Sequence, residues 1–554
     1  MPRYVIGLDY GTLSARAVLC AVADGSEIAS AVSEYRHGVM ERALPTGEPL
    51  PLDWALQHPS DYAEALYEII PAVIGKSGVD PADIIGIGID TTGCTLMPVT
   101  ADGTPLCLTD AYAHEKHAWV KLWKHHSTVP YADEIDRVAH ERKEPFLSRY
   151  GDKISSEWLL PKVLETLREA PAVYHDAAYF IELMDHLVWL LTGQLCRSAT
   201  ALGYKALWDH TDGFPSRDFY RAVDPALTDF AETRLAGRIV PTGEAAGLLT
   251  DAMAARLGLL PGTVVAIGTL DAHVAAPALS VTEEGQMFAV LGTSACHMVL
   301  GKKKLAVPGI CGCVEDGIMP GFVGYEAGQT CFGDLLAWFV ETSIPAAYEN
   351  EAKERGISVH ALLSEKAAAL RVGESGLLAL DWWNGNRSIL ADFSLSGLMM
   401  GMTLRTRPEE IYRALLESVA FGTRVIVENY RKYGVPVREL IATGGIAGKN
   451  PLLMQILADV LRFPVLIGAS SQAAACGSAI CAACAVGEEK GGYPSLASAA
   501  RAMGHVSDQI YLPDEERGAL YDRLFNEYLK LHDLFGRGAI DSMKTRRAIA
   551  AQNL

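Results

Sequence analysis

The chain has 554 residues, 49% of them hydrophobic and 21% charged, which is typical of a globular protein with a sizeable core. This length exceeds what one hydrophobic core usually fills, so we expect at least two domains. The formal net charge of −19 disfavours nucleic acid and anionic membranes as partners, because a negative field repels phosphate.

The N-terminus and the cysteines indicate a soluble, cytoplasmic protein. The first apolar run, residues 4–8, ends at Asp9 and is shorter than the apolar part of a signal peptide. No apolar stretch approaches the ~18 residues of a membrane span. Eleven scattered cysteines favour reduced thiols over a disulfide framework. Cys481 and Cys484 form a CxxC without a second pair, so we interpret them as core residues of an Ala-rich helix.

The first half of the chain opens with strands. Three alternating runs predict an antiparallel meander: residues 4–8, 16–22 and 27–35. A helix over 61–74, capped by Ser60, and a strand over 84–89, ending at Asp90, follow. Further on, a hairpin turn is expected at 101–103, and a buried helix at 179–191 with Gly193 as its stop.

The second half repeats this scheme of strand, acidic residue and small-residue loop. The expected elements are strands over 264–270, 287–291 and 440–442, a helix over 451–461, and an amphipathic helix over 514–534 followed by a loosely held tail after Gly536. The repetition predicts a duplicated α/β fold. We place the boundary so that the domains are residues 1–262 and 263–554.

Glycine and hydroxyl residues recur in turns after strands. Close backbone approach and short hydroxyls suit phosphate oxygens, and a carboxylate nearby suits Mg²⁺. The turns are Gly11, Thr12, Leu13 and Ser14 after Asp9; Gly292, Thr293 and Ser294; and Gly444 and Gly445 before Lys449 and Asn450. Each alone is also compatible with an ordinary turn. No Lys follows the first glycines as in a P-loop, and the dinucleotide G-x-G-x-x-G spacing is missing.

Taken together, these turns carry a family resemblance. The D-x-G-T turn, the later G-T-S turn, the segment GGIAGKNPLLMQILADVL and Ala473-Ala474-Ala475-Cys476-Gly477 resemble signature elements of the FGGY carbohydrate kinases. The resemblance extends from Tyr4 to about Gly487. It implies two duplicated actin/hexokinase-like (ribonuclease H-like) domains with a cleft between them, ATP as phosphoryl donor and Mg²⁺ bound with ATP, and it is compatible with a homodimer, which is common in that family.

The resemblance also implies roles for particular residues. Asp271 matches the catalytic base and Asp9 the magnesium site. Sugar contacts fall to Gly93, Lys205, Asp271 and Glu326. Nucleotide contacts fall to Gly11, Thr12, Leu13, Ser14, Gly292, Thr293, Gly444, Gly445, Lys449 and Asn450. A helix cap at Asp271 and a surface ion pair of Lys205 with Glu326 remain as structural alternatives. His273 is interpreted as a packed or supporting histidine.

Substrate choice rests on three segments that resemble the family members acting on L-ribulose: 153–158, 203–208 and 324–328. Phosphorylation of L-ribulose is therefore the leading hypothesis. A kinase of D-ribulose, D-xylulose or ribitol, and a nucleotide-switch ATPase like actin or Hsp70, stay open. Two positions depart from the family pattern, Leu13 in the first turn and Ile446 in the third.

Charged runs elsewhere are interpreted as solvated surface. His114, His117, His125 and His126 lack a further ligand type, so a solvated helix face is favoured over a metal site. Lys302, Lys303 and Lys304 are expected in a solvated turn.

Overall fold

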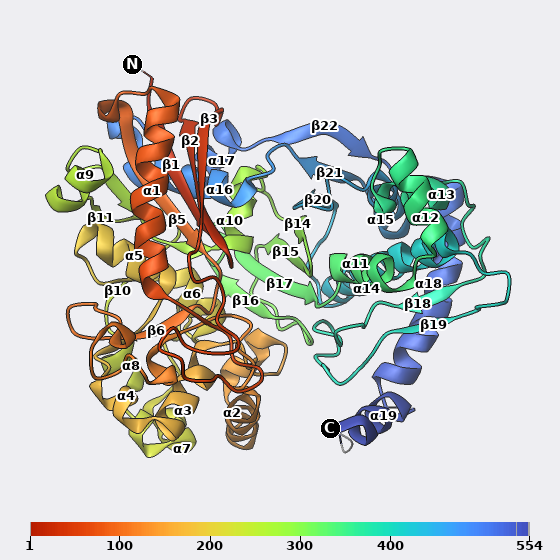
Figure 1. The fold of residues 1–554 in the computed structure, drawn as a ribbon, viewed down its shortest axis with the longest axis horizontal. Helices are drawn as coiled ribbons and strands as arrows, with labels where there is room; N and C mark the ends of the chain where they lie inside the picture. Colours follow the sequence, from red (N-terminus) through yellow and green to blue (C-terminus); the bar gives the residue numbers. More distant parts are fainter. Residues whose placement is uncertain (1, 539, 552–554) are drawn as a thin grey trace.

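Two seven-stranded mixed sheets, one in each half of the chain, organise the protein (Figure 1). The computed structural model describes residues 2–538 and 540–551. Within that part of the chain, no helix is both long enough and apolar enough to cross a membrane. The two sheets lie in separate lobes, as the duplicated α/β pattern predicts.

The sheet of the first lobe begins with the predicted meander, which is confirmed. Its strands are β1 (Tyr4–Tyr10), β2 (Ser14–Ala21) and β3 (Glu27–Glu34), each antiparallel to the next. On the other side of β1 lies β5 (Ile84–Thr91), which is parallel to it. The remaining strands are β12 (Val264–Ala266) and β13 (Thr269–Leu270), both parallel to β5, and the edge strand β11 (Ala245–Leu248).

The second lobe repeats this plan with a new set of strands. An antiparallel run contains β14 (Gln286–Leu291), β15 (Ala295–Gly301), β17 (Val323–Gln329) and β16 (Gly312–Glu315). The parallel neighbour of β14 is β20 (Glu439–Thr443), followed by β21 (Val465–Gly468) and β22 (Val506–Tyr511). In both lobes the central strand, β1 or β14, therefore forms a hairpin with the strand after it and pairs with one parallel strand on its other side.

The expected boundary after residue 262 cuts through the first sheet. Strands β12 and β13 come after it, yet they pair with β5. The expected single strand over 264–270 is also interrupted at Ile267 and Gly268. A Cβ on Gly268 would lie 2.6 Å from the Met184 Cβ, so the packing of Met184 leaves this bend no room for a side chain.

Between the sheets lies a layer of small-residue helices (Figure 1). Its members are α10 (Asp271–Ala278), α16 (Ala473–Val486) and α17 (Leu496–Met503). A Cβ on Gly7 of β1 or on Gly88 of β5 would lie 1.8 Å from a backbone oxygen of α16. A Cβ on Gly477 would lie equally close to the Val274 oxygen of α10. Helix α16 thus touches the first sheet through its backbone, although it comes late in the chain.

A helical subdomain extends the first lobe below its sheet (Figure 1). Its small sheet has the order β4 (Leu56–Gln57), β7 (Val120–Lys121), β6 (Leu96–Val99), β8 (Tyr179–Glu182). The helices that pack on it include α2 (Val129–Arg142), α3 (Leu159–Glu169), α4 (Pro171–Asp176), α7 (Arg217–Val223) and α8 (Phe230–Arg234). Helices α5 (Leu183–Thr192) and α6 (Ala199–Lys205) connect it to the cleft.

Several expected elements differ in their bounds. Helix α1 (Pro59–Ser77) begins before Ser60, because the His58 ring accepts the Ser60 N–H and caps the helix. The helix expected over 179–191 starts as strand β8, since residues 179–182 pair with β6. Helix α15 (Pro451–Leu461) and the Gly193 stop of α5 are confirmed.

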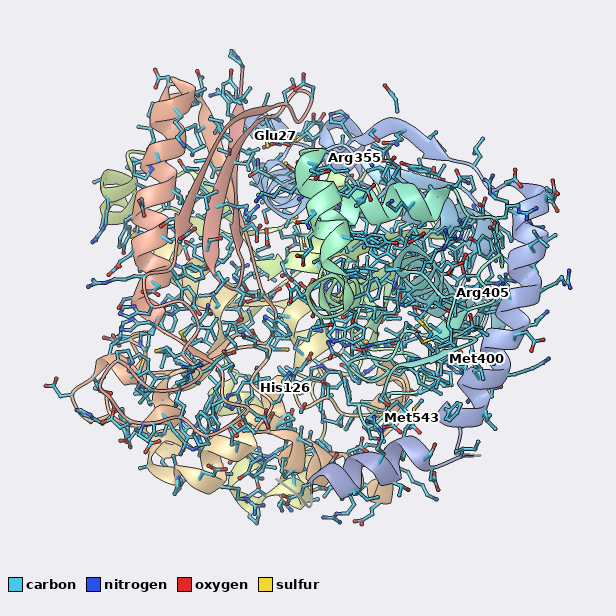
Figure 2. The ribbon with its side chains drawn as sticks, turned by 45° about the vertical axis from the view of Figure 1, so that its right-hand side comes forward. Glu27, His126, Arg355, Met400, Arg405 and Met543 are labelled. Atoms are coloured by element: carbon cyan, nitrogen blue, oxygen red, sulfur yellow. The ribbon has the colours of Figure 1, made fainter. Side chains whose placement is uncertain are left out.

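The C-terminal segment is held, contrary to the prediction of a loose tail. After α18 (Glu515–Gly536), the chain forms α19 (Ser542–Ala551). Met543, labelled in Figure 2, is 7% exposed and belongs to the core of the second lobe. The Lys544 ammonium lies 2.8 Å from the Asp392 carboxylate, which fixes the start of this helix.

The solvated histidine face is also wrong for two of its four members. His117 and His125 are 1% and 0% exposed and lie in the helical subdomain, where no α-helix carries them. The His125 Nε2 lies 2.9 Å from Glu165 Oε2. Of the lysine run, Lys304 is only part-exposed, and its Nζ lies 2.5 Å from Asp209 Oδ2.

Candidate active site

Three carboxylates meet where neighbouring parallel strands of the first sheet end. Asp9 on β1 and Asp90 on β5 are register partners. Strand β13 pairs with the same end of β5, and Asp271 follows it as the first residue of α10. The carboxyl ends of parallel strands are the usual place for a ligand site in an open α/β sheet. The topology therefore gathers residues far apart in the sequence.

Burial makes it unfavourable for the carboxylates of this cluster to carry their negative charges. The pKa of Asp90, which is 0% exposed, is raised well above its usual value by burial and by the charge of Asp9. Burial also raises the pKa of Asp9, although the Arg16 guanidinium, with its Nε 3.3 Å from Asp9 Oδ2, opposes the shift. For Asp271, burial and then Asp9 raise the pKa to about 7.

The cluster has the donor set of a divalent cation site. Its oxygen ligands suit Mg²⁺, and one arginine does not balance three carboxylates. Asp90 Oδ2 accepts a hydrogen bond of 2.6 Å from the Ser478 hydroxyl of α16. The buried Oδ1 of Asp90 has no hydrogen-bond partner among the described residues. A cation beside Asp9 and Asp90 would balance the negative charge of the cluster and give the Asp90 Oδ1 a partner.

The first two glycine turns occupy equivalent places in the two lobes. Gly11 N–H donates to the Ser14 oxygen between β1 and β2, and Gly292 N–H donates to the Ser294 oxygen between β14 and β15, both at 3.0 Å. Leu13 is 62% exposed at the tip of the first turn. The Thr293 carbonyl of the second turn accepts the Asp334 N–H of α11 (Gly333–Ser343).

The third turn lies against the second. Gly444 has φ of 93°, and a Cβ there would lie 2.6 Å from the Leu291 oxygen, so a side chain is excluded. Asn450 is 7% exposed, and its side-chain oxygen caps α15 by accepting the Leu453 N–H at 3.0 Å. The Lys449 N–H donates to the Ile446 oxygen. Two of the three predicted nucleotide turns are thus in contact.

Lys205 and Glu326 approach each other across the lobes. The Lys205 Nζ of α6 lies 3.4 Å from Glu326 Oε2 of β17, and the side chains are 13% and 9% exposed. The alternative of a surface ion pair is therefore wrong. Burial alone would raise the pKa of Glu326, but Lys205 and His273, whose Nε2 lies 3.2 Å from Glu326 Oε2, hold it well below its usual value.

Gly93 and Asp271 border this ion pair. A Cβ on Gly93 would lie 3.5 Å from Lys205 Cε, so the glycine backbone faces the lysine stem. The charges of Asp9, Lys205 and Glu326 all act on the pKa of Asp271. Asp271 is therefore close enough to Asp9 and to the buried ion pair for the charges of both to shift its pKa. It is not the cap of α10; its carboxylate accepts the Ala272 N–H at 2.8 Å from the first turn of the helix.

Some residues of the site did not emerge from the sequence as functional candidates. Asp90 was noted only as a strand end, although it follows its strand just as Asp9 does. Ser478 gave no signal, because its partner lies 388 positions away. Glu157 and Arg387 form an ion pair of 3.3 Å between the lobes. Glu157 lies in the segment 153–158, which was singled out only by resemblance, and Arg387 was not singled out.

Two family models match the chain. The model for the N-terminal domain of the FGGY family of carbohydrate kinases matches residues 4–277, and that for the C-terminal domain matches residues 287–486. A ribulokinase of Geobacillus thermodenitrificans is 52% identical over 98% of this chain and 96% of its own length. A ribulokinase of Mycolicibacterium smegmatis is 48% identical over 97% of this chain and 94% of its own.

Solved structures resemble the fold at lower identity. A xylulose kinase of Rhodospirillum rubrum has a TM-score of 0.77 and 23% identity, with 96% of this chain and 98% of that chain covered. A gluconate kinase of Lactobacillus acidophilus has a TM-score of 0.78 and 18% identity, with 97% and 99% covered. These likenesses confirm the predicted actin/hexokinase-like (ribonuclease H-like) fold in two domains.

Proposed function

The chain belongs to the FGGY family of carbohydrate kinases, and from this premise we propose that it transfers the γ-phosphoryl group of ATP to L-ribulose. Relatives about half identical over nearly the whole chain are ribulokinases, which supports ribulose as the acceptor. The product is L-ribulose 5-phosphate, with ADP released.

One observation carries the proposal at the level of chemistry. Asp271 follows β13 at the strand ends that carry Asp9 and Asp90, and its pKa responds to the charges of Asp9 and of the Lys205–Glu326 pair. A phosphoryl donor held near Asp9 and a polyol held near Lys205 would therefore meet at Asp271. The predicted residues therefore need no rearrangement to bring donor and acceptor together.

Asp271 acts as the general base. Its carboxylate accepts the proton of the terminal sugar hydroxyl as the hydroxyl oxygen attacks the γ-phosphorus, and the bond to the β–γ bridging oxygen of ATP breaks. The proton then passes from Asp271 to solvent. A pKa raised to about 7 by burial and by Asp9 strengthens the base while leaving much of it ionised near neutral pH.

The acidic cluster supports Mg²⁺ at Asp9. Asp9 would be the protein ligand, with Asp90 behind it held by Ser478. When bound, such an ion would supply positive charge that offsets the negative charge developing on the leaving ADP. The glycine turns at Gly11–Ser14, Gly292–Thr293 and Gly444–Gly445 would hold phosphates and nucleoside through backbone N–H groups, with Lys449 at the rim.

The buried ion pair suits the sugar. A polyol removed from water needs a donor and an acceptor at each hydroxyl, which Lys205, Glu326 and the Gly93 backbone supply together. Because Lys205 belongs to one lobe and Glu326 to the other, their approach also closes the cleft around the sugar. Closure excludes water, so that phosphate passes to the sugar hydroxyl.

The test is ADP release with Mg·ATP across L-ribulose, D-ribulose, D-xylulose, ribitol and glycerol. L-ribulose is expected to give the highest kcat/KM. Asp271→Asn should lower kcat by about 10²–10⁴-fold, the usual contribution of a general base, with the fold retained. Asp251→Asn is the matched control, because Asp251 also begins a helix, α9 (Asp251–Leu257), but is exposed.

The outcomes separate the alternatives. A higher kcat/KM for another polyol would change the substrate and leave the kinase assignment in place. Equal activity of the Asp271 and Asp251 variants would remove Asp271 as the base. ADP release that no sugar stimulates would favour a nucleotide-switch ATPase instead.

A further inference from the structure

Lys162 is a buried lysine beside the turn of residues 92–95, which joins β5 to β6, and no carboxylate among the described residues is hydrogen-bonded to it. Lys162, on α3, is 0% exposed, and its Nζ donates to the Cys94 oxygen at 2.5 Å and to the Leu122 oxygen at 2.6 Å. Burial lowers its pKa, opposed by Cys94 and Glu182. Lysines are almost never fully buried without a strong reason, because the ammonium gives up its hydration. The two carbonyls that it holds indicate what the reason is.

The first of these carbonyls belongs to a strained turn. Cys94 follows Gly93 between β5 and β6, is 3% exposed, and has φ of 58°. A left-handed conformation is unfavourable for a residue with a Cβ, so it persists only where the surroundings enforce it. The dihedral angles of Cys94 set the direction of its carbonyl. By fixing that carbonyl, the Lys162 ammonium selects the left-handed conformation.

The rest of the turn is held by its own threonines and by its neighbours, because the Thr92 N–H donates to the Tyr10 oxygen of β1 and the Thr95 oxygen accepts the Leu183 N–H. The Thr92 and Thr95 hydroxyls lie 2.8 Å apart, and the Thr95 hydroxyl donates to the Thr92 oxygen at 3.0 Å. These bonds close the turn, and none of them involves Gly93 or Cys94. The Gly93–Cys94 peptide borders Lys205, since a Cβ on Gly93 would lie 3.5 Å from Lys205 Cε. A change at Cys94 would therefore change the backbone offered to the sugar.

A nearby carboxylate helps to keep the lysine charged. Glu182, at the end of β8, is 3% exposed, and neither of its oxygens has a hydrogen-bond partner among the described residues. Burial raises its pKa to about 7, and Lys162 is the first group to oppose this. Lys162 and Glu182 are thus each other's compensating charge within the same core.

We infer that Lys162 is a positioning residue for sugar binding, which sets the Gly93–Cys94 peptide through the Cys94 carbonyl without touching the sugar. The inference rests on the proposed function, because it gives Gly93 a role only if a sugar binds there. It predicts a selective effect on the sugar and none on the nucleotide turns, which lie on other strands.

The principal variant is Lys162→Met, which keeps the apolar stem and removes the ammonium. The KM for L-ribulose should rise by about 10- to 100-fold, as expected when hydrogen bonds from a charged donor are lost, with the KM for ATP within about 2-fold. Lys121→Met is the matched control. Lys121 is 2% exposed in the same subdomain, and its Nζ bonds to Glu165, to Thr166 and to the backbone oxygen of Lys162, but not to Cys94.

A second pair of variants tests the turn itself and does not depend on the lysine variant folding. Cys94→Val leaves Lys162 intact but resists a positive φ, so it should also raise the sugar KM, by about 5-fold or more. Cys107→Val, at another buried cysteine of the same core, should not. Glycine adopts a positive φ freely, so Cys94→Gly added to Lys162→Met should recover most of the lost sugar affinity.

Unchanged sugar KM in both Lys162→Met and Cys94→Val would overturn the inference. A loss in Lys162→Met that Cys94→Gly does not relieve, or an equal loss in Lys121→Met, would reduce Lys162 to a purely structural role. Should the wild-type enzyme show no sugar-stimulated ADP release, the proposed function fails first, and this inference falls with it.

Discussion

Asp271 occupies a position in which its carboxylate is costly to ionise. Burial disfavours the charge, Asp9 repels it, and only the Ala272 N–H and Lys205 favour it. These opposing influences leave the pKa at about 7, within the range where enzymes work. The same surroundings that make the group a better base therefore make it sensitive to pH.

The pH profile of kcat/KM tests this environment. Because the base must be unprotonated, kcat/KM for L-ribulose should rise about tenfold per pH unit below about pH 7 and level off above it. Lys205 lowers the pKa of Asp271, so in Lys205→Met the bend should move to higher pH. A profile that is flat from about pH 5.5 to 8.5 in the wild type would contradict the role of Asp271.

Among individual residues, those next to a glycine or at a strand end could be predicted. Asp9 was a candidate because it ends an apolar run before a glycine turn, whereas Asp271, which also ends an apolar run, became the candidate base through the family resemblance. Lys162 was not, because a lysine inside an amphipathic helical segment is expected to reach solvent. His117 and His125 failed for the same reason. Their polarity favours the surface, and only the chain fold supplies Lys121 and Glu165 as buried partners.

Glycines, which have no side chain, allow helix α16 to pack directly against the backbones of its neighbours. Gly7 and Gly88 of the sheet and Gly477 of the helix let backbones meet where a Cβ would overlap an oxygen. The closeness also brings Ser478 to Asp90. An element at position 473 of the chain thus completes a site that begins at position 9.

Two glycine-to-alanine substitutions, one in α16 and a control in α1, test how tightly α16 is packed. Gly477→Ala should lower stability by about 1–3 kcal/mol or more, because the added Cβ meets the Val274 oxygen of α10 and overpacks the interface. Gly75→Ala on the exposed side of α1 meets nothing within 4 Å and should raise stability by about 1 kcal/mol through helix propensity. Scanning calorimetry on both would measure the difference, and equal melting temperatures would mean that α16 moves aside freely.

At the scale of elements, local signals fixed some helices and failed at others. Helix α15 was predicted to the residue from Pro451 at its first turn, and in the structure Asn450 caps it. Residues 179–182 were expected to be helical because their apolar run continues into α5. Their pairing with β6, a strand more than eighty positions earlier, decides otherwise and carries no local signal. The tail after Gly536 was misjudged similarly, because Met543 finds its core only in the fold.

The lobes also meet through charged side chains beside the Lys205–Glu326 pair. Glu157, which precedes α3, lies 3.3 Å from Arg387 of the second lobe, and both are about one-fifth exposed. The attraction to Glu157 raises the pKa of Arg387 above its usual range. Partial exposure keeps such a pair weak, so it can be broken without unfolding the protein.

Weakening this bridge should loosen closure. In Glu157→Gln the KM for L-ribulose should rise by about 2- to 5-fold, matching the ~1 kcal/mol upper value of a partly exposed pair. The share of ADP released without sugar phosphorylation should also rise, since water enters an open cleft. Glu141→Gln, which breaks the exposed Arg137–Glu141 pair within α2, is the control. Identical behaviour of the two variants would separate the bridge from closure.

The late arrival of α16 has a consequence for synthesis of the chain. The first sheet is complete in sequence by Leu270, yet the helix that covers Gly7 and Gly88 is not made until residues 473–486. A nascent chain emerging from the ribosome therefore carries this sheet with one face uncovered while some two hundred more residues are added. Domains usually fold as units during translation, from the N-terminus onward. Because α16 covers this sheet, we expect the first lobe to complete its packing only once residues 473–486 have been made.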